Sequence, residues 1–441
     1  MLYRVSAKET RKQMRATGID PRKVKFYDIG EQTISERSFG SVYGVTNLYR
    51  DVRNVQNVNN VEEKLSRLEG IAATTIQRLH QSVEESLSSF VLTRDETQNL
   101  RRFLFIMHYR HAQLSTSYFD PAHPDNAIGK ERMIRMQNDL GLHTSADMWL
   151  HFLEYYLDTP HSSLIQHGAQ CMKTMSTKSF IAHAPLRPDL EYFEAVPYLQ
   201  QSDGYYLGFW KAAPGQEFVL GHKSFGIYEG TAIPPLELHK VFVVSPQITM
   251  ILRSVELRAE SMEQNRELGS HVRYFSDLMN IRLPPASTHY TSGVPHFSGY
   301  TPKYEMGSPA WQAEKALHFL AQHNPDDKYE FPITTLTPEQ TYAVNRIVLF
   351  NTESTGSITY SSDASMLDTA SRYEKDPRII LQGKGRKFTS LIRQLELQVS
   401  EAEKARELED FIADHHLEKW SRRQKGDKAQ SVEHGNLVKP M

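Results

Sequence analysis

Apolar residues in the first half of the chain recur at helical spacing. One set is separated by three, four and seven residues, which places its members on one helical face: Val61, Leu65, Leu68, Ala72 and Leu79. Asn60 and Glu63 are spaced to cap the start of this helix. Further helices are predicted near 126–140 and from the Ser145 cap to Leu157.

The strongest helical signal lies between residues 93 and 110. Thr93-Arg-Asp-Glu96 forms a capping box, with acidic residues in the first turn where the helix dipole favours them. The following stretch, 100–110, is apolar on almost every side, which is typical of a helix in the interior of a fold. We therefore expect this segment to be the buried central helix of the protein.

After about residue 200 the pattern changes to short β-branched and aromatic runs, broken by Gly and Pro. These runs predict strands at 205–210, 217–220, 225–228, 241–245 and 248–252. A helical pattern then predicts a segment over 257–280, helices starting at Pro309 and Thr337, and a helix over 364–373 after a strand at 356–360. Finally, heptad-like apolar spacing from Leu391 to Ile412 predicts a long C-terminal helix.

These elements predict an α+β, mainly helical protein. We expect a helical N-terminal lobe around the buried central helix, a small mostly antiparallel sheet, and a helical C-terminal part with a long terminal helix. The predicted division is an extended leading segment 1–59, a helical lobe 60–200, an α+β lobe 201–380, a C-terminal helix 381–420 and a disordered tail 421–441. The stretch 283–310, rich in Pro, Ser, Thr, Gly and Tyr, is expected to be a long loop or lid, and its role stays open.

Composition narrows the class of protein. The 51 Lys and Arg nearly balance the 53 Asp and Glu, so net charge does not support binding to nucleic acid or to anionic lipid. The single cysteine, Cys171, excludes an intramolecular disulfide and favours a reducing compartment. No apolar run of about 18 residues and no signal-peptide core is visible. We expect a soluble protein of the cytoplasm or nucleus.

Few residues suggest specific chemistry. His108 and His111 are three positions apart, but a zinc site needs three or four ligands, so we predict no metal and no cofactor. His167 and Cys171 are spaced as a possible nucleophile pair, although an inert buried cysteine is the commoner case. In the turn 383–387, Lys384 and Arg386 are weak candidates for binding a phosphate before a helix, with a solvated loop as the alternative.

Four blocks of sequence resemble a known family. They are 43–51 (YGVTNLYRD), 61–69 (VEEKLSRLE), 92–110 (LTRDE followed by LRRFLFIMHYR) and 217–254, which includes LHKVFVVSP and ILRS. In this order they are similar to the fungal branch of the family known as domain of unknown function 4238, over about residues 25–375. The resemblance implies no activity, because none is established for the family.

The chain departs from that family at one position of interest. Where members carry Thr/Ser-Asp-Asn after a strand, this chain has Gly221, His222 and Lys223. A histidine cannot replace an aspartate as the same carboxylate ligand or base. Members also typically open with a His/Pro-containing segment, of which no equivalent is visible. Either an active site has been lost or rebuilt here, or these are turn residues.

Three hypotheses for function follow. The first is a non-catalytic or degenerate scaffold that binds a partner. The second is an enzyme acting on a phosphorylated or nucleic-acid substrate, with catalytic candidates Arg110, His222, Lys223 and Glu229 and ligand-binding candidates Arg101 and Arg102. Arg110 leads because a guanidinium at the end of an apolar helix needs an anion, either a substrate or a structural carboxylate. The third is self-association, or binding of a protein partner, through 386–420.

Overall fold

The computed structural model describes the chain in several ranges. These are residues 23–38, 41–42, 56–110, 119–127, 130–174, 190–222, 224–233, 236–257, 276–289, 303, 308–321, 324–384, 386–405 and 407. The predicted helix over 257–280, most of the 283–310 loop and the tail 421–441 fall wholly or mainly outside the described residues.

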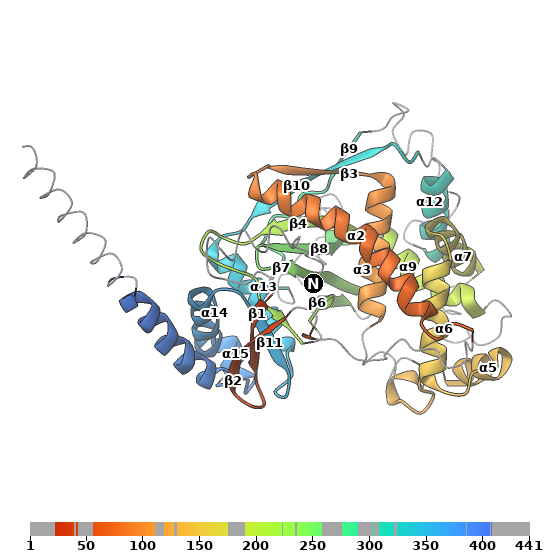
Figure 1. The fold of residues 1–441 in the computed structure, drawn as a ribbon. Coiled ribbons are helices and arrows are strands. Elements are labelled where there is room, and N and C mark those ends of the chain that lie inside the picture. The colour runs from red at the N-terminus through yellow and green to blue at the C-terminus, as the bar shows by residue number, and fades with distance from the viewer. Residues whose placement is uncertain are drawn as a thin grey trace, which may run out of the picture.

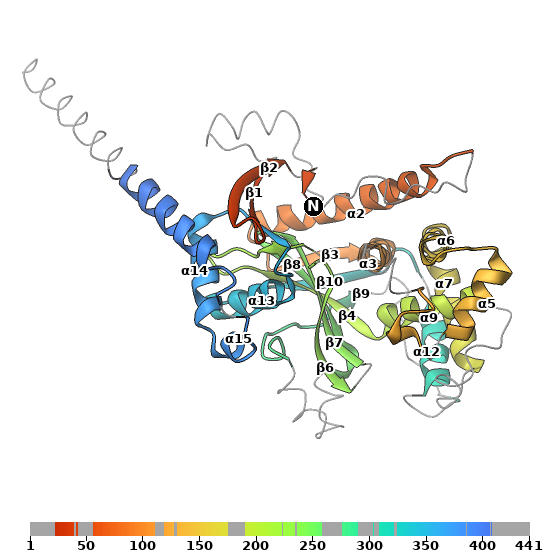
Figure 2. The same ribbon diagram turned by 90° about the horizontal axis from the view of Figure 1, so that it is seen from below.

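A mixed seven-stranded sheet occupies the middle of the molecule (Figures 1 and 2). Six strands lie side by side in this sheet, and neighbouring strands are antiparallel except for one parallel pair, β10 with β4. A short strand, β9, also pairs with β10. The strands in spatial order are β3 (Ser89–Thr93), β10 (Lys328–Thr335), β4 (Tyr205–Lys211), β8 (Ile248–Ser254), β7 (Leu236–Ser245) and β6 (Ile227–Ile233), with β9 at Ser287–His289.

Both faces of this sheet are covered, because successive side chains of its strands enter two different hydrophobic cores. In β4, Leu207 and Phe209 belong to one core, whereas Tyr206 and Trp210 belong to the other. The strand period of two places alternate residues on opposite faces, so a run that is apolar at every position indicates a sheet buried on both sides. The same alternation holds in β8, where Met250 and Ile251 enter different cores.

Helices from both halves of the chain form the first core, and Figure 2 shows them to one side of the sheet. Helix α12 comes from the C-terminal half of the chain, yet it packs against α7 and α9. The helical group is therefore not confined to residues 60–200. The helices are α2 (Asn60–Glu84), α3 (Arg94–Tyr109), α5 (Lys130–Leu140), α6 (Ser145–Asp158), α7 (His161–Thr174), α9 (Leu190–Asp203) and α12 (Pro309–Ala321), with 3₁₀ turns η2 (Pro124–Asn126) and η4 (Val255–Leu257).

Helix α3 is the predicted central helix, and its burial is confirmed. It contacts α2, α6, α7, α9, β3 and β10. Leu100, Leu104 and Ile106 are fully buried along it. Its start is the predicted capping box, in which Thr93 Oγ1 accepts from the Glu96 amide and the Glu96 carboxylate accepts from the Thr93 amide.

The predicted cap of α2 is wrong. The N-cap residue is Asn59, and it makes no side-chain cap hydrogen bond. The Asn60 side-chain amide (Nδ2) instead donates to Glu154 of α6 at 2.8 Å, and Glu63 accepts from the side chain of Asn57. The two side chains that sequence spacing assigned to capping thus make other contacts, Asn60 with α6 and Glu63 with Asn57.

A second, four-stranded antiparallel sheet brings together distant parts of the chain. Its order is β2 (Thr33–Ser38), β1 (Lys23–Asp28), β11 (Ser357–Tyr360) and β5 (Leu220–Gly221). The leading segment is therefore partly a hairpin of a sheet rather than only extended chain. The strand predicted over 217–220 shrinks to β5, because the amides of Glu217 and Val219 donate to Ser365 and Asn345 instead of to a strand.

Three helices cover the other face of the larger sheet: α13 (Pro338–Asn351), α14 (Asp363–Lys375) and α15 (Pro377–Leu381). Residues 389–405 continue as the predicted C-terminal helix. Its first turns carry the buried Leu391 and Leu395, and it then projects away from the body of the molecule (Figure 1). The observed mixture of helices and sheets confirms the α+β class. In the described part of the chain, no helix combines the length and apolar character that spanning a bilayer requires.

Candidate functional site

Arg101 and Arg102 each satisfy the carboxyl end of a helix. Arg101 donates to the carbonyl oxygens of Ser202, in the last turn of α9, and of Tyr205, the first residue of β4, at 3.1 and 2.8 Å. Arg102 donates to the carbonyl oxygens of Tyr156 and Leu157, in the last turn of α6. The last carbonyls of a helix lack backbone donors and carry the negative end of its dipole, which a guanidinium stabilises. These two consecutive residues of α3 thus join it to two neighbouring helices.

Arg110 is paired with a carboxylate of the protein itself. Its guanidinium forms an ion pair with Glu69 of α2, and both side chains are about 30 % exposed. The sequence left two anions open for this arginine, a substrate or a structural carboxylate. The structure supplies the carboxylate.

Glu229 lies in a buried polar network. Its Oε2 atom is 2.8 Å from His239 Nδ1 and accepts from Ser276 Oγ at 2.8 Å. Arg253 Nε donates to His239 Nε2 at 2.8 Å, so the imidazole proton resides on Nδ1 and is donated to Glu229. Burial lowers the pKa of His239, despite the bond to Glu229 that acts the other way. The histidine is therefore neutral.

This network lacks the geometry of a hydrolytic triad. In a triad the hydroxyl faces one imidazole nitrogen and the carboxylate faces the other. Here Ser276 and Glu229 both lie at Nδ1, whereas Arg253 takes Nε2. Arg253 also donates to the carbonyl oxygens of Leu278 and Ile281. The network thus anchors residues 276–281 to strands β6, β7 and β8.

Asp277 of the same segment also belongs to a closed ring of four charged side chains. The Asp277 amide donates to Glu229 Oε1 at 2.7 Å, and its carboxylate pairs with Arg346 and Arg378. These two arginines also pair with Asp376, at 3.1 and 2.7 Å. Two acids and two bases alternate, so the ring is neutral. It ties the 276–281 segment to α13 and α15.

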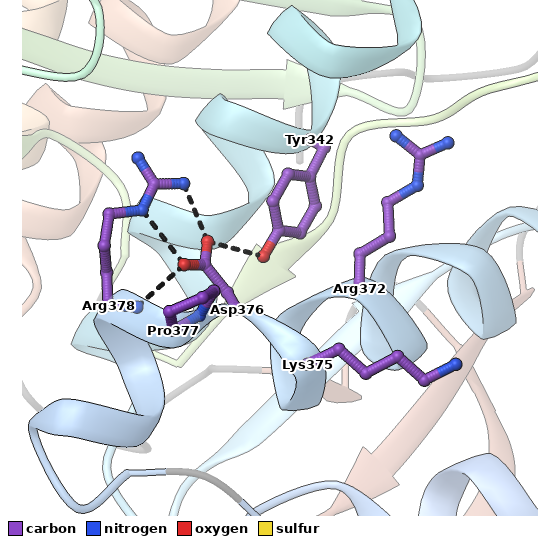
Figure 3. A pocket seen from close by; sticks show the side chains of 6 residues that line it. All are labelled: Tyr342, Arg372, Lys375, Asp376, Pro377 and Arg378. Atoms are coloured by element: carbon purple, nitrogen blue, oxygen red, sulfur yellow. Dashed lines mark hydrogen bonds and ion pairs between the residues drawn. The ribbon is translucent and has the colours of Figure 1, made fainter.

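One open pocket borders this ring, between α13, α14 and α15 (Figure 3). Its volume is about 550 Å³. Figure 3 shows Arg378 and Tyr342 on opposite sides of the Asp376 carboxylate, with Arg372 beyond the tyrosine ring. The Tyr342 hydroxyl donates to Asp376 at 3.1 Å. Burial, reinforced by this carboxylate, raises the pKa of Tyr342, so the phenol keeps its proton. The lining residues are Tyr342, Arg372, Lys375, Asp376, Pro377 and Arg378.

The Gly221–Lys223 departure from the family pattern lies at the end of β5. The His222 amide donates to the Ser357 carbonyl of β11 at 2.7 Å, and the His222 side chain is half-buried. The Ser224 hydroxyl accepts from the Gly221 amide at 2.6 Å, a side-chain-to-backbone turn bond. Lys223 is outside the described residues. His222 follows β5, whereas Glu229 lies in β6.

The basic turn 383–387 lies against the carboxyl end of α13. Lys384 donates to the Phe350 carbonyl, and Lys387 donates to those of Leu349 and Thr352. Burial, followed by the charge of Lys384, lowers the pKa of Lys387 to about 8. Arg386 is exposed, with a left-handed backbone (φ 71°). A helix end thus faces the two lysines of this turn.

Among the described residues, the remaining candidates from the sequence do not assemble a metal centre; His111 lies outside that part of the chain. Across the described ranges, no three His, Cys, Asp or Glu side chains come together in a way that could hold an ion. His167 Nδ1 is 2.8 Å from the hydroxyl of Tyr155, and Cys171 is half-buried on the same helix, α7. His108 packs its ring edge-to-face with Tyr228 at 4.7 Å.

Sequence reasoning missed the pocket at α13–α15. Its residues come from two stretches separated by about thirty positions, and none belongs to a recognisable motif. A signal was present in the density of charge over 372–378, RYEKDPR, where three cations surround a single Asp-Pro helix start. That run has the composition of an ordinary solvated helix end, so nothing in it marks a pocket.

The fold and these contacts define an α+β protein built on two sheets, in which most polar candidates serve structural contacts. Residues 12–184 match the model of a family described as protein of unknown function (DUF4238). Over these residues the chain is similar to that family. The matched range contains the first three blocks of the resemblance, whereas the fourth block, 217–254, and the pocket lie beyond it. No curated protein and no solved structure matches the chain.

Proposed function

We propose that this protein is a non-catalytic scaffold that binds a partner, and that it acts in the cytoplasm or nucleus. The observation that supports this most is the use of Arg101, Arg102, Arg110 and Glu229 in contacts within the chain. Catalysis needs groups within reach of a substrate. Side chains that stabilise helix ends, an ion pair and a buried histidine hold the fold together instead.

The proposal includes a division into two lobes. A helical lobe over 60–200 would surround α3, and an α+β lobe over 201–380 would pack on it. The two hydrophobic cores on opposite faces of the larger sheet support this picture. Strand β3 and helix α12 cross the boundary, since each packs with elements from the other part of the chain. We infer that the lobes unfold together for this reason.

Arg110 gives the sharpest test of scaffold against enzyme. Arg110→Met and Glu69→Gln break the same ion pair, so the scaffold proposal expects similar, small losses of stability, about 0.2–1 kcal/mol each for a partly exposed pair. The response of thermal stability to inorganic phosphate should be the same in both variants as in the natural chain.

The enzyme alternative expects a different outcome. If Arg110 bound a phosphorylated substrate, Arg110→Met would abolish a phosphate-dependent shift in melting temperature, whereas Glu69→Gln would keep or increase it by freeing the guanidinium. That result would overturn the scaffold proposal. Circular dichroism of both variants shows whether the fold has been retained.

A second candidate function is self-association through the C-terminal helix. Apolar positions of this helix continue beyond the buried Leu391 and Leu395 to Val399 and Ala402, on the part that leaves the body (Figures 1 and 2). Leu397 is 67 % exposed. A second copy could cover this surface in a helix pair.

The structure determines where a truncation should be made. Ending the chain near residue 380 would remove Phe388, Leu391 and Leu395, all fully buried, and would damage the core. Ending it after residue 396 keeps them. Self-association expects the full chain to have twice the solution mass of one copy and the shortened chain to be a monomer. The same oligomeric state for both chains would rule this candidate out.

A further inference from the structure

We propose that the pocket between α13, α14 and α15 binds a small molecule that carries a phosphate group beside a flat apolar ring. This inference goes beyond the scaffold proposal and does not depend on it. The pocket's volume of about 550 Å³ falls in the range of about 300–1,000 Å³ that is usual for small-molecule sites.

The charge of the lining favours an anion. Three cations, Arg372, Lys375 and Arg378, surround a single carboxylate, Asp376. That carboxylate accepts from the Arg378 side chain, from Arg346 and from Tyr342, so its charge is balanced by groups already in place. An incoming anion would therefore meet cationic groups with little repulsion from Asp376.

The terminal guanidinium nitrogens of Arg372 can donate hydrogen bonds to a phosphate. Its only recorded side-chain bond is from Nε to Asp368 Oδ1, at 3.0 Å, one turn earlier on α14. In the described part of the chain, its two terminal nitrogens donate to nothing. These nitrogens form a planar fork that fits two phosphate oxygens. The same Asp368 bond fixes the side chain on the pocket side of the helix, beside Tyr342 (Figure 3).

Lys375 provides a second cation from the same helix. It lies three residues after Arg372, and residues at this spacing share one face. No hydrogen bond or ion pair to a described residue is recorded for its amine. Figure 3 shows its side chain extended away from Asp376, and its long flexible stem allows it to turn toward a ligand. We therefore expect it to contribute less than Arg372.

Tyr342 and Pro377 supply the apolar part of the site. The tyrosine ring stands between Arg372 and Asp376 in Figure 3, with its hydroxyl engaged by the carboxylate. Its ring face and the proline ring are the flat apolar surfaces of the lining, since the other lining residues are charged. An aromatic ring stacks favourably on such a surface. A phosphate without a ring would make no contact with these two apolar surfaces.

The competing explanation is that these cations only stabilise the end of α14. Arg372 and Lys375 lie in its last turn, where a positive charge interacts favourably with the negative end of the helix dipole. That role requires no ligand. The two explanations differ in whether a phosphate ester binds saturably, and in which substitutions affect its binding.

The experiment measures binding of phenyl phosphate to the full chain by calorimetry, with inorganic phosphate and phenol as the two halves of the probe. We expect saturable binding of phenyl phosphate, at least fivefold tighter than that of inorganic phosphate, and no measurable binding of phenol. Arg372→Gln should weaken binding at least tenfold, and Lys375→Gln about threefold. Lys404→Gln, on the exposed C-terminal helix, removes one charge elsewhere and should leave it unchanged.

A second variant separates a damaged fold from a lost ligand contact. Asp368→Ala removes the acceptor of the Arg372 Nε bond but keeps the guanidinium, so it should retain phenyl phosphate binding within threefold. Absence of saturable binding to the natural chain would overturn the proposal, as would an unchanged affinity in Arg372→Gln. Equal affinities for phenyl phosphate and inorganic phosphate would refute the apolar part. Neither result bears on the Arg110 test, so the two proposals fail separately.

Discussion

The ion pair between Arg94 and Asp327 allows the packing of the central helix to be tested. Arg94 is the first residue of α3, and Asp327 immediately precedes β10. Their side chains are 1 % and 2 % exposed, and the Arg94 NH2 to Asp327 Oδ2 distance is 2.7 Å. The guanidinium also lies 4.5 Å from the ring centre of Phe319 in α12. The pair thus links the start of the central helix to a strand 233 residues later.

The substitution Asp327→Ala would leave the Arg94 charge buried without its carboxylate. Removing one partner of a buried ion pair costs about 3–5 kcal/mol, because the remaining charge is no longer compensated. A typical domain is stable by about 5–15 kcal/mol, so this loss is a large part of the total. Replacing both residues, Arg94→Met with Asp327→Ala, removes the charge itself and should recover part of the lost stability.

The assay is urea denaturation, followed by tryptophan fluorescence and far-ultraviolet circular dichroism. The matched control is Glu36→Ala, which breaks the exposed pair of Glu36 with Lys23, whose side chains are 61 % and 51 % exposed. An exposed pair contributes about 0–1 kcal/mol, so this control should hardly change the unfolding midpoint. A loss for Asp327→Ala no larger than that of the control would refute the reasoning. So would a double variant less stable than the single one.

Two further predictions concern α3 and α2. Arg102→Met should lower the free energy of unfolding by about 1.5–3 kcal/mol in the same assay, because the carbonyls of Tyr156 and Leu157 lose a charged donor; a loss below 0.5 kcal/mol would contradict the helix-end role. Burial lowers the pKa of His80 to about 4. The unfolded chain therefore binds more protons than the folded one between about pH 6.5 and pH 4, and stability should fall as the pH falls through this window. His80→Gln should show a smaller decrease from pH 7 to pH 5, and an equal decrease would contradict the assignment.

Local signals in the sequence predicted individual elements well. The capping box at Thr93 starts α3 as expected, and Thr337 followed by Pro338 starts α13 as expected. The apolar run 100–110 predicted the buried central helix, since a helix without a polar face has to be covered on all sides. These signals depend on residues within one or two helical turns of each other. Such short-range patterns can be identified from the order of residues alone.

Pairing between distant segments was not predictable in the same way. Nothing around Lys23–Asp28 indicates that this strand pairs with β11, more than 300 positions later. Likewise, Ser89–Thr93 looks like the approach to a helix cap, yet it forms β3 beside β10. A strand's own pattern shows that it will be buried, whereas its partner is chosen by packing of the whole chain.

The candidate site shows the same limit. Arg110 stood out because a charge at the end of an apolar helix needs a partner. Arg110 and the ligand-binding candidates Arg101 and Arg102 each have their partner within the chain. The sequence could establish the need but not the identity of the partner. Asp277, Arg346, Asp376 and Arg378 come from three separate stretches, so their ring exists only in the folded protein.

The sequence by itself determined the α+β class, the central helix and the family resemblance, which the match over residues 12–184 supports in part. Each follows from short-range periodicity, capping or local similarity. Tertiary structure alone decided that helix ends receive Arg101 and Arg102, and that three helices form a cationic pocket around Tyr342. The physical reason is that the surroundings of a charged side chain consist of backbone and side-chain groups from distant parts of the sequence. Long-range packing determines which of these groups lie beside it.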